Sequence, residues 1–202
     1  MKKFITFEGG EGAGKTTLID SMEKALVKQG FQVLKVREPG GTKLGEAARN
    51  LLLHVEGFVS PYAELCLFLA SRAQHLAEVI EPALKAGKIV LCDRFNDSSV
   101  AYQGLGRGLG MDKVQQMCDL VCHGLVPEMT FYLDIDPAVG LARAQKARGS
   151  KDRIESETLS FHQKIREAYH QLHKKHPKRL HLLDASQPPE QVFAQAMACL
   201  TK

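Results

Sequence analysis

The sequence has no long apolar run and no recognisable export signal. Its longest purely apolar run, 65–70, spans six residues, whereas a membrane-spanning helix needs about 20. The lysines that open the chain resemble the start of a signal peptide, but Glu8 ends the apolar segment 4–7 far too early for an export core. We therefore expect neither membrane insertion nor export, and no membrane partner.

Paired cysteines and a strong excess of charge are also missing. The five cysteines are odd in number and irregularly spaced, unlike the framework of a small secreted scaffold. Lysine and arginine number 27 against 23 aspartates and glutamates, a net charge of +4. This balance is too mild to indicate nucleic acid and suits anionic small molecules equally well. We expect a cytoplasmic protein without a nucleic-acid partner.

Short β-branched or aromatic segments alternate with longer segments of helical periodicity. This pattern is typical of an α/β fold in three layers, with a parallel sheet covered by helices on both faces. Repeats and linkers are lacking, so we expect a single domain over 1–202. The expected strands cover 4–7, 33–36, 89–92, 130–133 and 180–183, and the expected helices cover 15–29, 44–53, 61–86, 112–122, 137–146, 158–175 and 190–200.

Residues 9–16 match the pattern G-x-x-x-x-G-K-[ST] between an expected strand and an expected helix, the context that this motif requires. Small residues let backbone N–H groups surround a phosphate at the positive end of a helix. Lys15 would reach the β and γ oxygens, and Thr16 could hold Mg²⁺. The candidate nucleotide-binding residues are Gly9, Gly10, Glu11, Gly12, Ala13, Gly14, Lys15, Thr16 and Thr17.

Other nucleotide-binding classes lack their motifs here. A G-x-G-x-x-G match would end on Lys15 when started at Gly10, and on Leu109 when started at Gly104. An N-K-x-D motif is absent, and Asp93 does not begin the D-x-x-G of a GTPase switch, because residues 93–96 read D-R-F-N. A phosphoryl-transfer enzyme is favoured. Two alternatives stay open: a kinase for a different nucleoside monophosphate, and a regulatory NTPase, against which the missing switch motifs argue.

Polar residues follow the expected strands, where an open α/β sheet binds its ligands. A carboxylate in a phosphate cradle repels nucleotide, so Glu11 makes sense if it points at an acceptor hydroxyl. Arg37 begins a bent segment, 37–42, and supplies a cation. Asp93 could hold Mg²⁺ through water while Arg94 clamps a phosphate.

Three further positions complete the candidates for metal and base binding. Asp134, after the fourth expected strand, is the alternative metal ligand. Phe68 and Arg72 stand four apart on one expected helix and share a face, so a ring and a guanidinium could receive one flat base.

These residues together resemble the thymidylate kinase family of P-loop nucleoside monophosphate kinases, in particular its bacterial type, whose phosphate loop reads E-G-x-E-G-A-G-K-T-T. The matching segments are 8–17, 37–42, 68–72, 93–94, 101–104 and 152–155. The resemblance implies a P-loop kinase fold. It also implies a cytoplasmic homodimer that phosphorylates dTMP to dTDP with ATP and Mg²⁺, a step in dTTP synthesis.

The resemblance also implies roles for single residues. Glu11 would take the 3′-hydroxyl of dTMP and Arg94 its phosphate. Phe68 would stack on thymine, and Arg72 would bond its O4 edge. The remaining substrate-binding residues carried over are Tyr102 beside C2′, Ser99 near the base, Gln103 and Arg37.

Residues 142–153 concentrate basic side chains around Gly149. In the bacterial type, a mobile lid carries the arginines that neutralise the transferred phosphoryl group, because the phosphate loop has no spare basic residue. The resemblance implies this role for Arg143, Arg148 and Arg153, and a solvated basic loop is the alternative.

Two other clusters are better explained as structure. Cys118 and Cys122 with His123 could suggest zinc, but a buried helix stripe explains them. The basic segment 173–179 has no interleaved aromatic residues and is typical of a solvated helix end rather than a nucleic-acid site.

Overall fold

The computed structural model describes residues 2–148 and 153–200. Its centre is a five-stranded sheet with the strand order β2-β3-β1-β4-β5, and all neighbouring strands are parallel. The predicted strands are confirmed, each one or two residues longer than expected. The strands are β1 (Phe4–Glu8), β2 (Val33–Arg37), β3 (Ile89–Asp93), β4 (Met129–Asp134) and β5 (Leu180–Asp184).

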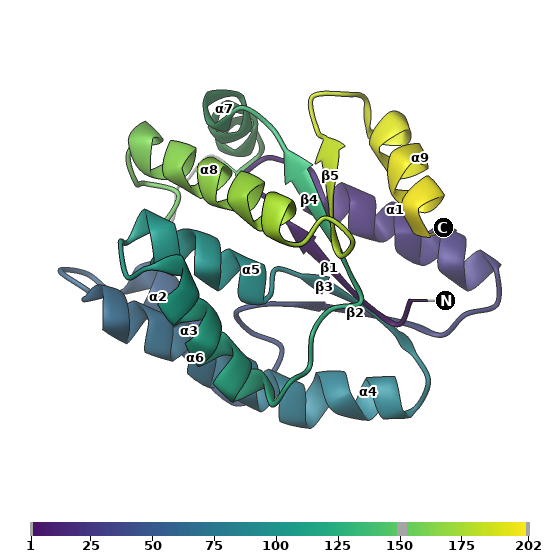
Figure 1. Ribbon diagram of the computed structural model, residues 1–202, viewed down its shortest axis with the longest axis horizontal. Helices are drawn as coiled ribbons and strands as arrows, with labels where there is room; N and C mark the ends of the chain where they lie inside the picture. Colours follow the sequence, from purple (N-terminus) through teal and green to yellow (C-terminus); the bar gives the residue numbers. More distant parts are fainter. Residues whose placement is uncertain (1, 149–152, 201–202) are drawn as a thin grey trace.

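Helices cover both faces of the sheet, so the predicted three-layer α/β fold is confirmed (Figure 1). Side chains alternate along β1, and Ile5 and Phe7 pack on one face with α1 (Lys15–Lys28) and α9 (Pro189–Leu200). Phe4 belongs to a separate core on the opposite face. The other longer helices are α2 (Lys43–His54), α3 (Pro61–His75), α6 (Met111–Cys122), α7 (Pro137–Arg148) and α8 (Leu159–Lys175).

The predicted single helix over 61–86 is interrupted in the structure. α3 runs into a π-helical turn, η1 (Leu76–Ile80), and then into the short α4 (Glu81–Lys85). Pro82 explains the change, because proline has no N–H to donate and its ring would clash with the carbonyl four residues earlier in a regular helix. A wider turn just before it relieves that clash.

Two helical segments in the stretch after β3 were not predicted. They are α5 (Asn96–Ser99) and η2 (Val100–Gly106), and residues 96–104 are all buried. The buried positions of this stretch include polar residues, beginning with Asn96 to Ser99, so no alternation of an apolar and a polar face marks it as a helix in the sequence. Throughout residues 2–148 and 153–200, no helix combines the length and hydrophobicity that spanning a membrane requires.

Candidate active site

The carboxyl ends of β1, β2 and β3 meet at one edge of the sheet and open into a cleft of about 980 Å³. Asp93 is level with Phe7 in β1 and with Arg37 in β2, so the loops that follow these strands lie together. Small-molecule sites usually measure about 300–1,000 Å³, so this cleft is at the upper end of their range. The predicted site residues that line it are Glu11 to Thr17, Arg37, Phe68, Arg72, Asp93, Arg94, Ser99, Tyr102, Gln103 and Arg143.

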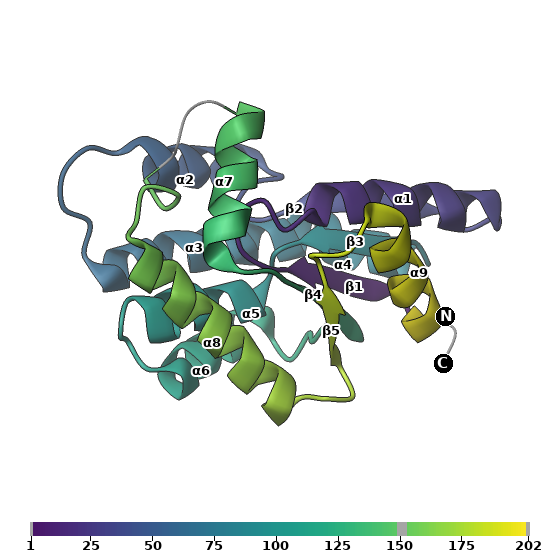
Figure 2. The same cartoon turned by 90° about the horizontal axis from the view of Figure 1, so that it is seen from above.

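The phosphate loop owes its shape to glycine. Gly9, Gly12 and Gly14 have φ values of +146°, +66° and +91°, a region that other residues rarely adopt. A side chain on Gly12 would collide with the carbonyl oxygen of Gly140, because α7 packs directly against the loop (Figure 2). Gly14 precedes α1 without a capping side chain, which leaves the helix N–H groups to an anion.

Lys15 is buried at the first position of α1. Its Nζ donates to the carbonyl oxygens of Gly9 and Gly10, each at 3.1 Å. Burial and the nearby charge of Arg94 lower the pKa of Lys15, whereas the carboxylates around it oppose this shift. The ammonium group is thus held at the rim of the loop, where phosphates would bind.

Arg94 and Glu11 form an ion pair in the same cleft, with 2.5 Å between Nη2 and Oε1. Arg94 has a φ of +69°, which is unusual for a residue with a side chain. Its N–H bonds Phe7 O at 2.9 Å, and its guanidinium lies 5.1 Å from the centre of the Tyr102 ring. The structure therefore brings the predicted acceptor-side residues Glu11, Arg94 and Tyr102 together.

Asp93 and Thr16 suit Mg²⁺ chemically. The Asp93 Oδ1 atom is buried and has no hydrogen-bond partner among the described residues, and Thr16 lines the same cleft. A carboxylate and a hydroxyl are oxygen ligands of the kind that Mg²⁺ prefers, with water completing its shell.

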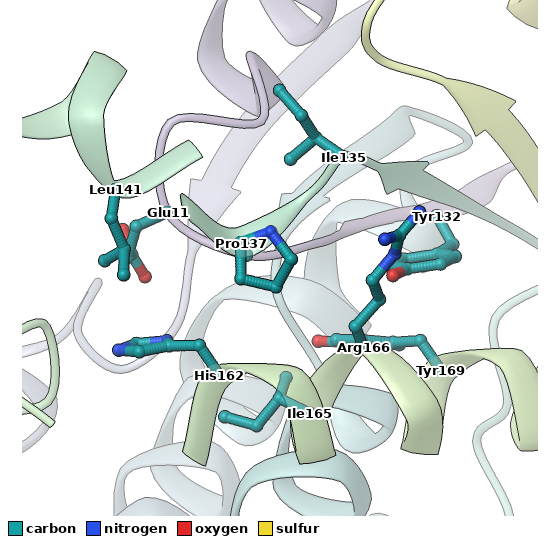
Figure 3. A pocket seen from close by; sticks show the side chains of 10 residues that line it. Glu11, Tyr132, Ile135, Pro137, Leu141, His162, Ile165, Arg166 and Tyr169 are labelled. Carbon is teal, nitrogen blue, oxygen red and sulfur yellow. The ribbon is translucent and has the colours of Figure 1, made fainter. Parts of the chain in front are cut away.

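Asp134, the alternative metal ligand, is already engaged in an ion pair. Arg166 donates to both of its oxygens, at 2.7 and 2.9 Å, and the Tyr132 hydroxyl donates at 2.9 Å. Burial would raise the pKa of Asp134, but these hydrogen bonds outweigh it and keep the pKa below its ordinary value. Figure 3 shows Tyr132, Arg166 and His162 in a small pocket that Glu11 also lines.

The predicted base-binding wall is organised around Arg72. This fully buried side chain donates from Nε to Glu38 at 2.6 Å and from Nη1 to Ser99 at 3.1 Å. The Phe95 ring lies 5.0 Å from its guanidinium carbon. Phe68, one turn earlier on α3, is half-buried beside the cleft. Arg72 is therefore held in one orientation before any ligand binds.

The predicted basic residues are not all placed at the phosphate loop. Arg37 is exposed and pairs with Glu46, and Arg143 donates to Ala185 O at 3.0 Å while lining the cleft. Arg153 bonds Leu52 O and Glu64, away from the loop. Arg148 ends α7, but its side chain and residues 149–152 of the predicted lid lie outside the described residues.

The two clusters explained as structure have local partners. Cys118 Sγ lies 3.6 Å from Arg72 Nη1, and Cys122 Sγ donates to Asn96 Oδ1 at 3.3 Å. In the basic segment 173–179, Arg179 forms a bidentate ion pair with Asp97.

Three buried carboxylates support the site and were given no role from the sequence. Glu8 accepts from the N–H of Phe95, next to Arg94; Glu38 holds Arg72; Glu64 contacts Gln103. Each had a positional signal, because Glu8 precedes the phosphate loop, Glu38 follows Arg37, and Glu64 stands four residues before Phe68. Position alone does not separate such an acid from a solvated one.

The three-layer α/β fold, the phosphate loop and the adjoining acceptor-side residues define a P-loop nucleotide kinase. The family model described as thymidylate kinase matches residues 7–196. The chain therefore belongs to the thymidylate kinase family, a family of enzymes that phosphorylate dTMP to dTDP.

Curated relatives and a solved structure agree with this assignment. The chain is 51% identical to the thymidylate kinase of Protochlamydia amoebophila, over 98% of this chain and 91% of the relative. It is 46% identical to that of Geobacillus sp. (strain WCH70), over 98% and 95%. The crystal structure of thymidylate kinase from Ehrlichia chaffeensis matches with a TM-score of 0.81 and 33% identity, covering 98% of this chain and 97% of that one.

Proposed function

We propose that this chain transfers the γ-phosphoryl group of ATP to dTMP in the presence of Mg²⁺. The observation that carries the proposal is the single cleft lined both by the phosphate loop and by Arg94, Phe68 and Arg72. One end provides backbone N–H groups and Lys15 for a polyphosphate. The other end provides a cation for a monophosphate and a wall for a base.

The arrangement of side chains suits transfer between two bound nucleotides. Glu11 and Arg94 would hold the sugar hydroxyl and the phosphate of the acceptor, and their ion pair fixes them relative to each other. Lys15 would neutralise charge on the transferred group. Thr16, and Asp93 through water, would hold Mg²⁺, which supplies further charge neutralisation at the phosphates when it is bound.

A coupled assay of ADP release tests the proposal. We expect rapid ADP formation from MgATP only when dTMP is present, with much slower reaction on dCMP or without an acceptor. Equal or faster reaction with another nucleoside monophosphate would assign the chain to a different kinase. Hydrolysis that does not depend on an acceptor would support a regulatory NTPase.

We further propose that the single domain 1–202 acts in the cytoplasm as a homodimer. All five cysteines are free, which suits a reducing compartment. α2, α3 and α6 lie side by side (Figures 1 and 2), and exposed apolar residues lie on or between them. These residues, called here the apolar face, are Leu51, Phe58, Tyr62 and Leu120.

A further inference from the structure

Glu64 is the buried centre of a polar network on the acceptor side of the cleft. It lies in the first turn of α3, and the spacing of four places it in line with Phe68 and Arg72. It accepts hydrogen bonds from Gln103 Nε2 at 2.9 Å, from Arg107 Nε and Nη2 at 3.1 Å each, and from Arg153 Nη2 at 2.7 Å.

The charge of Glu64 determines how Gln103 is oriented. Burial would raise the pKa of Glu64, but the hydrogen bonds from Arg107, Gln103 and Arg153 outweigh it and hold the pKa below its ordinary value. An ionised carboxylate can only accept hydrogen bonds, so Gln103 must present its NH₂ group to Glu64. Its carbonyl oxygen then occupies the opposite end of the amide.

Gln103 lines the cleft, and within the described residues its carbonyl oxygen has no hydrogen-bond partner. Arg72 shows the complementary pattern. Its Nε and Nη1 atoms are used by Glu38, Ser99 and Cys118, while Nη2 has no partner within the same residues. Two fixed groups of opposite character, a donor and an acceptor, therefore remain for a ligand beside Phe68.

We propose that Glu64 sets the base preference of the acceptor site by fixing which end of the Gln103 amide meets the base. This inference rests on the proposed function. Thymine carries an acceptor, O4, next to a donor, N3–H, which matches Arg72 Nη2 and Gln103 Oε1. Cytosine carries an amino donor and a ring acceptor at those positions, so both contacts would fail at once. Glu64 is a positioning residue here, because it acts through Gln103.

The test compares kcat/KM for dTMP with kcat/KM for dCMP in the full-length enzyme. Glu64→Gln replaces an obligate acceptor with an amide that can also donate. The side-chain amide of Gln103 can then rotate by 180° and still be hydrogen-bonded. We expect the dTMP-to-dCMP ratio to fall at least about tenfold. Gln103→Leu should lower the ratio similarly, and adding Glu64→Gln to it should change the ratio little further, because the two residues act as one unit.

Two further variants separate base selection from a purely structural role. Arg107→Gln removes an ion pair from Glu64 but leaves the Gln103 contact, so it should keep the ratio. Gln103→Asn keeps the amide on a shorter side chain that cannot reach Glu64 and the base together, so it should lower the ratio even if Glu64→Gln does not fold.

An unchanged ratio in folded Glu64→Gln or in Gln103→Asn would overturn the inference, as would independent effects in the double variant. These results would leave the proposed function standing if the wild-type enzyme still prefers dTMP. A wild-type enzyme without that preference would overturn both.

Discussion

Lys15 is the residue whose removal should separate activity from stability most clearly. Its ammonium is buried against two carbonyl groups of its own loop, and this burial lowers its pKa. The desolvation of the charge offsets the stability that its hydrogen bonds contribute to the folded state. We expect Lys15→Ala to lower kcat more than about tenfold, equivalent to at least about 1.4 kcal/mol of barrier, with an unchanged melting temperature. Lys28→Ala, an exposed change on the same helix, is the control and should leave both unchanged. A variant that retains near-normal kcat would contradict the role of the loop lysine.

Glu8 should give the protein a characteristic pH dependence of stability. Burial, and next the charge of Asp97, raise its pKa from 4.5 to about 7, against the hydrogen bonds of Ser98 and Tyr169 and the charge of Arg94. The folded state holds the Glu8 proton more tightly than the unfolded state does. The contribution of this proton to the free energy of unfolding is therefore complete below about pH 4.5 and is lost as the pH rises through 7.

Urea unfolding of the wild type and Glu8→Gln at pH 5 and pH 8 measures this effect. The free energy of unfolding of the wild type, relative to the variant, should fall over this range by up to about 3 kcal/mol. The variant cannot titrate at this position, so it serves as the reference for the wild type at each pH. A difference that stays constant or grows with pH would show that Glu8 is already ionised at pH 5.

At the scale of elements, Arg153 helps to attach the segment after α7 to α2 and α3. Arg153 donates to Leu52 O at 2.9 Å and to the buried Glu64 at 2.7 Å. Arg153→Ala should therefore destabilise the fold by about 1–3 kcal/mol, or several degrees in melting temperature.

Arg148→Ala, by its predicted lid role, should lower kcat more than it raises KM for dTMP and leave the melting temperature unchanged. Equal melting temperatures for the two variants would contradict the attachment.

The elements that the sequence predicted well are those with one buried and one exposed face, or with strand-like composition. All five strands were found, because β-branched and aromatic runs bounded by turns are a local property. The π-helical turn η1 was missed, since it adjusts a helix around Pro82 without changing the periodicity. α5 and η2 were missed because their buried positions, 96–104, mix polar and apolar residues and show no amphipathic periodicity.

At the scale of the whole molecule, the site combines locally encoded residues with a supporting network that only the tertiary structure brings together. The phosphate loop is contiguous, and Arg37, Asp93 and Arg94 lie at or just after the ends of strands, so the rule for open sheets placed them together. The supporting network could not be predicted, since Gln103 and Arg153 reach Glu64 from 39 and 89 residues away. Only tertiary structure shows that Arg153 binds Glu64 rather than the phosphate loop.

The proposed homodimer can be tested at the apolar face. The apolar face includes Leu120, which is 76% exposed, and a homodimer would bury it against the partner. We expect light scattering after gel filtration to give a dimer for the wild type and a monomer for Leu120→Asp, because the charge would be buried without a counter-ion.

The matched control is Val27→Asp. Val27 is 54% exposed on α1, at a distance from the apolar face (Figure 1), so this variant should remain a dimer. A single exposed substitution usually changes stability by less than about 0.5 kcal/mol, so both variants should stay folded and a change in mass would report association alone. A monomeric wild type would refute the homodimer, and a dimeric Leu120→Asp would exclude the apolar face as its interface.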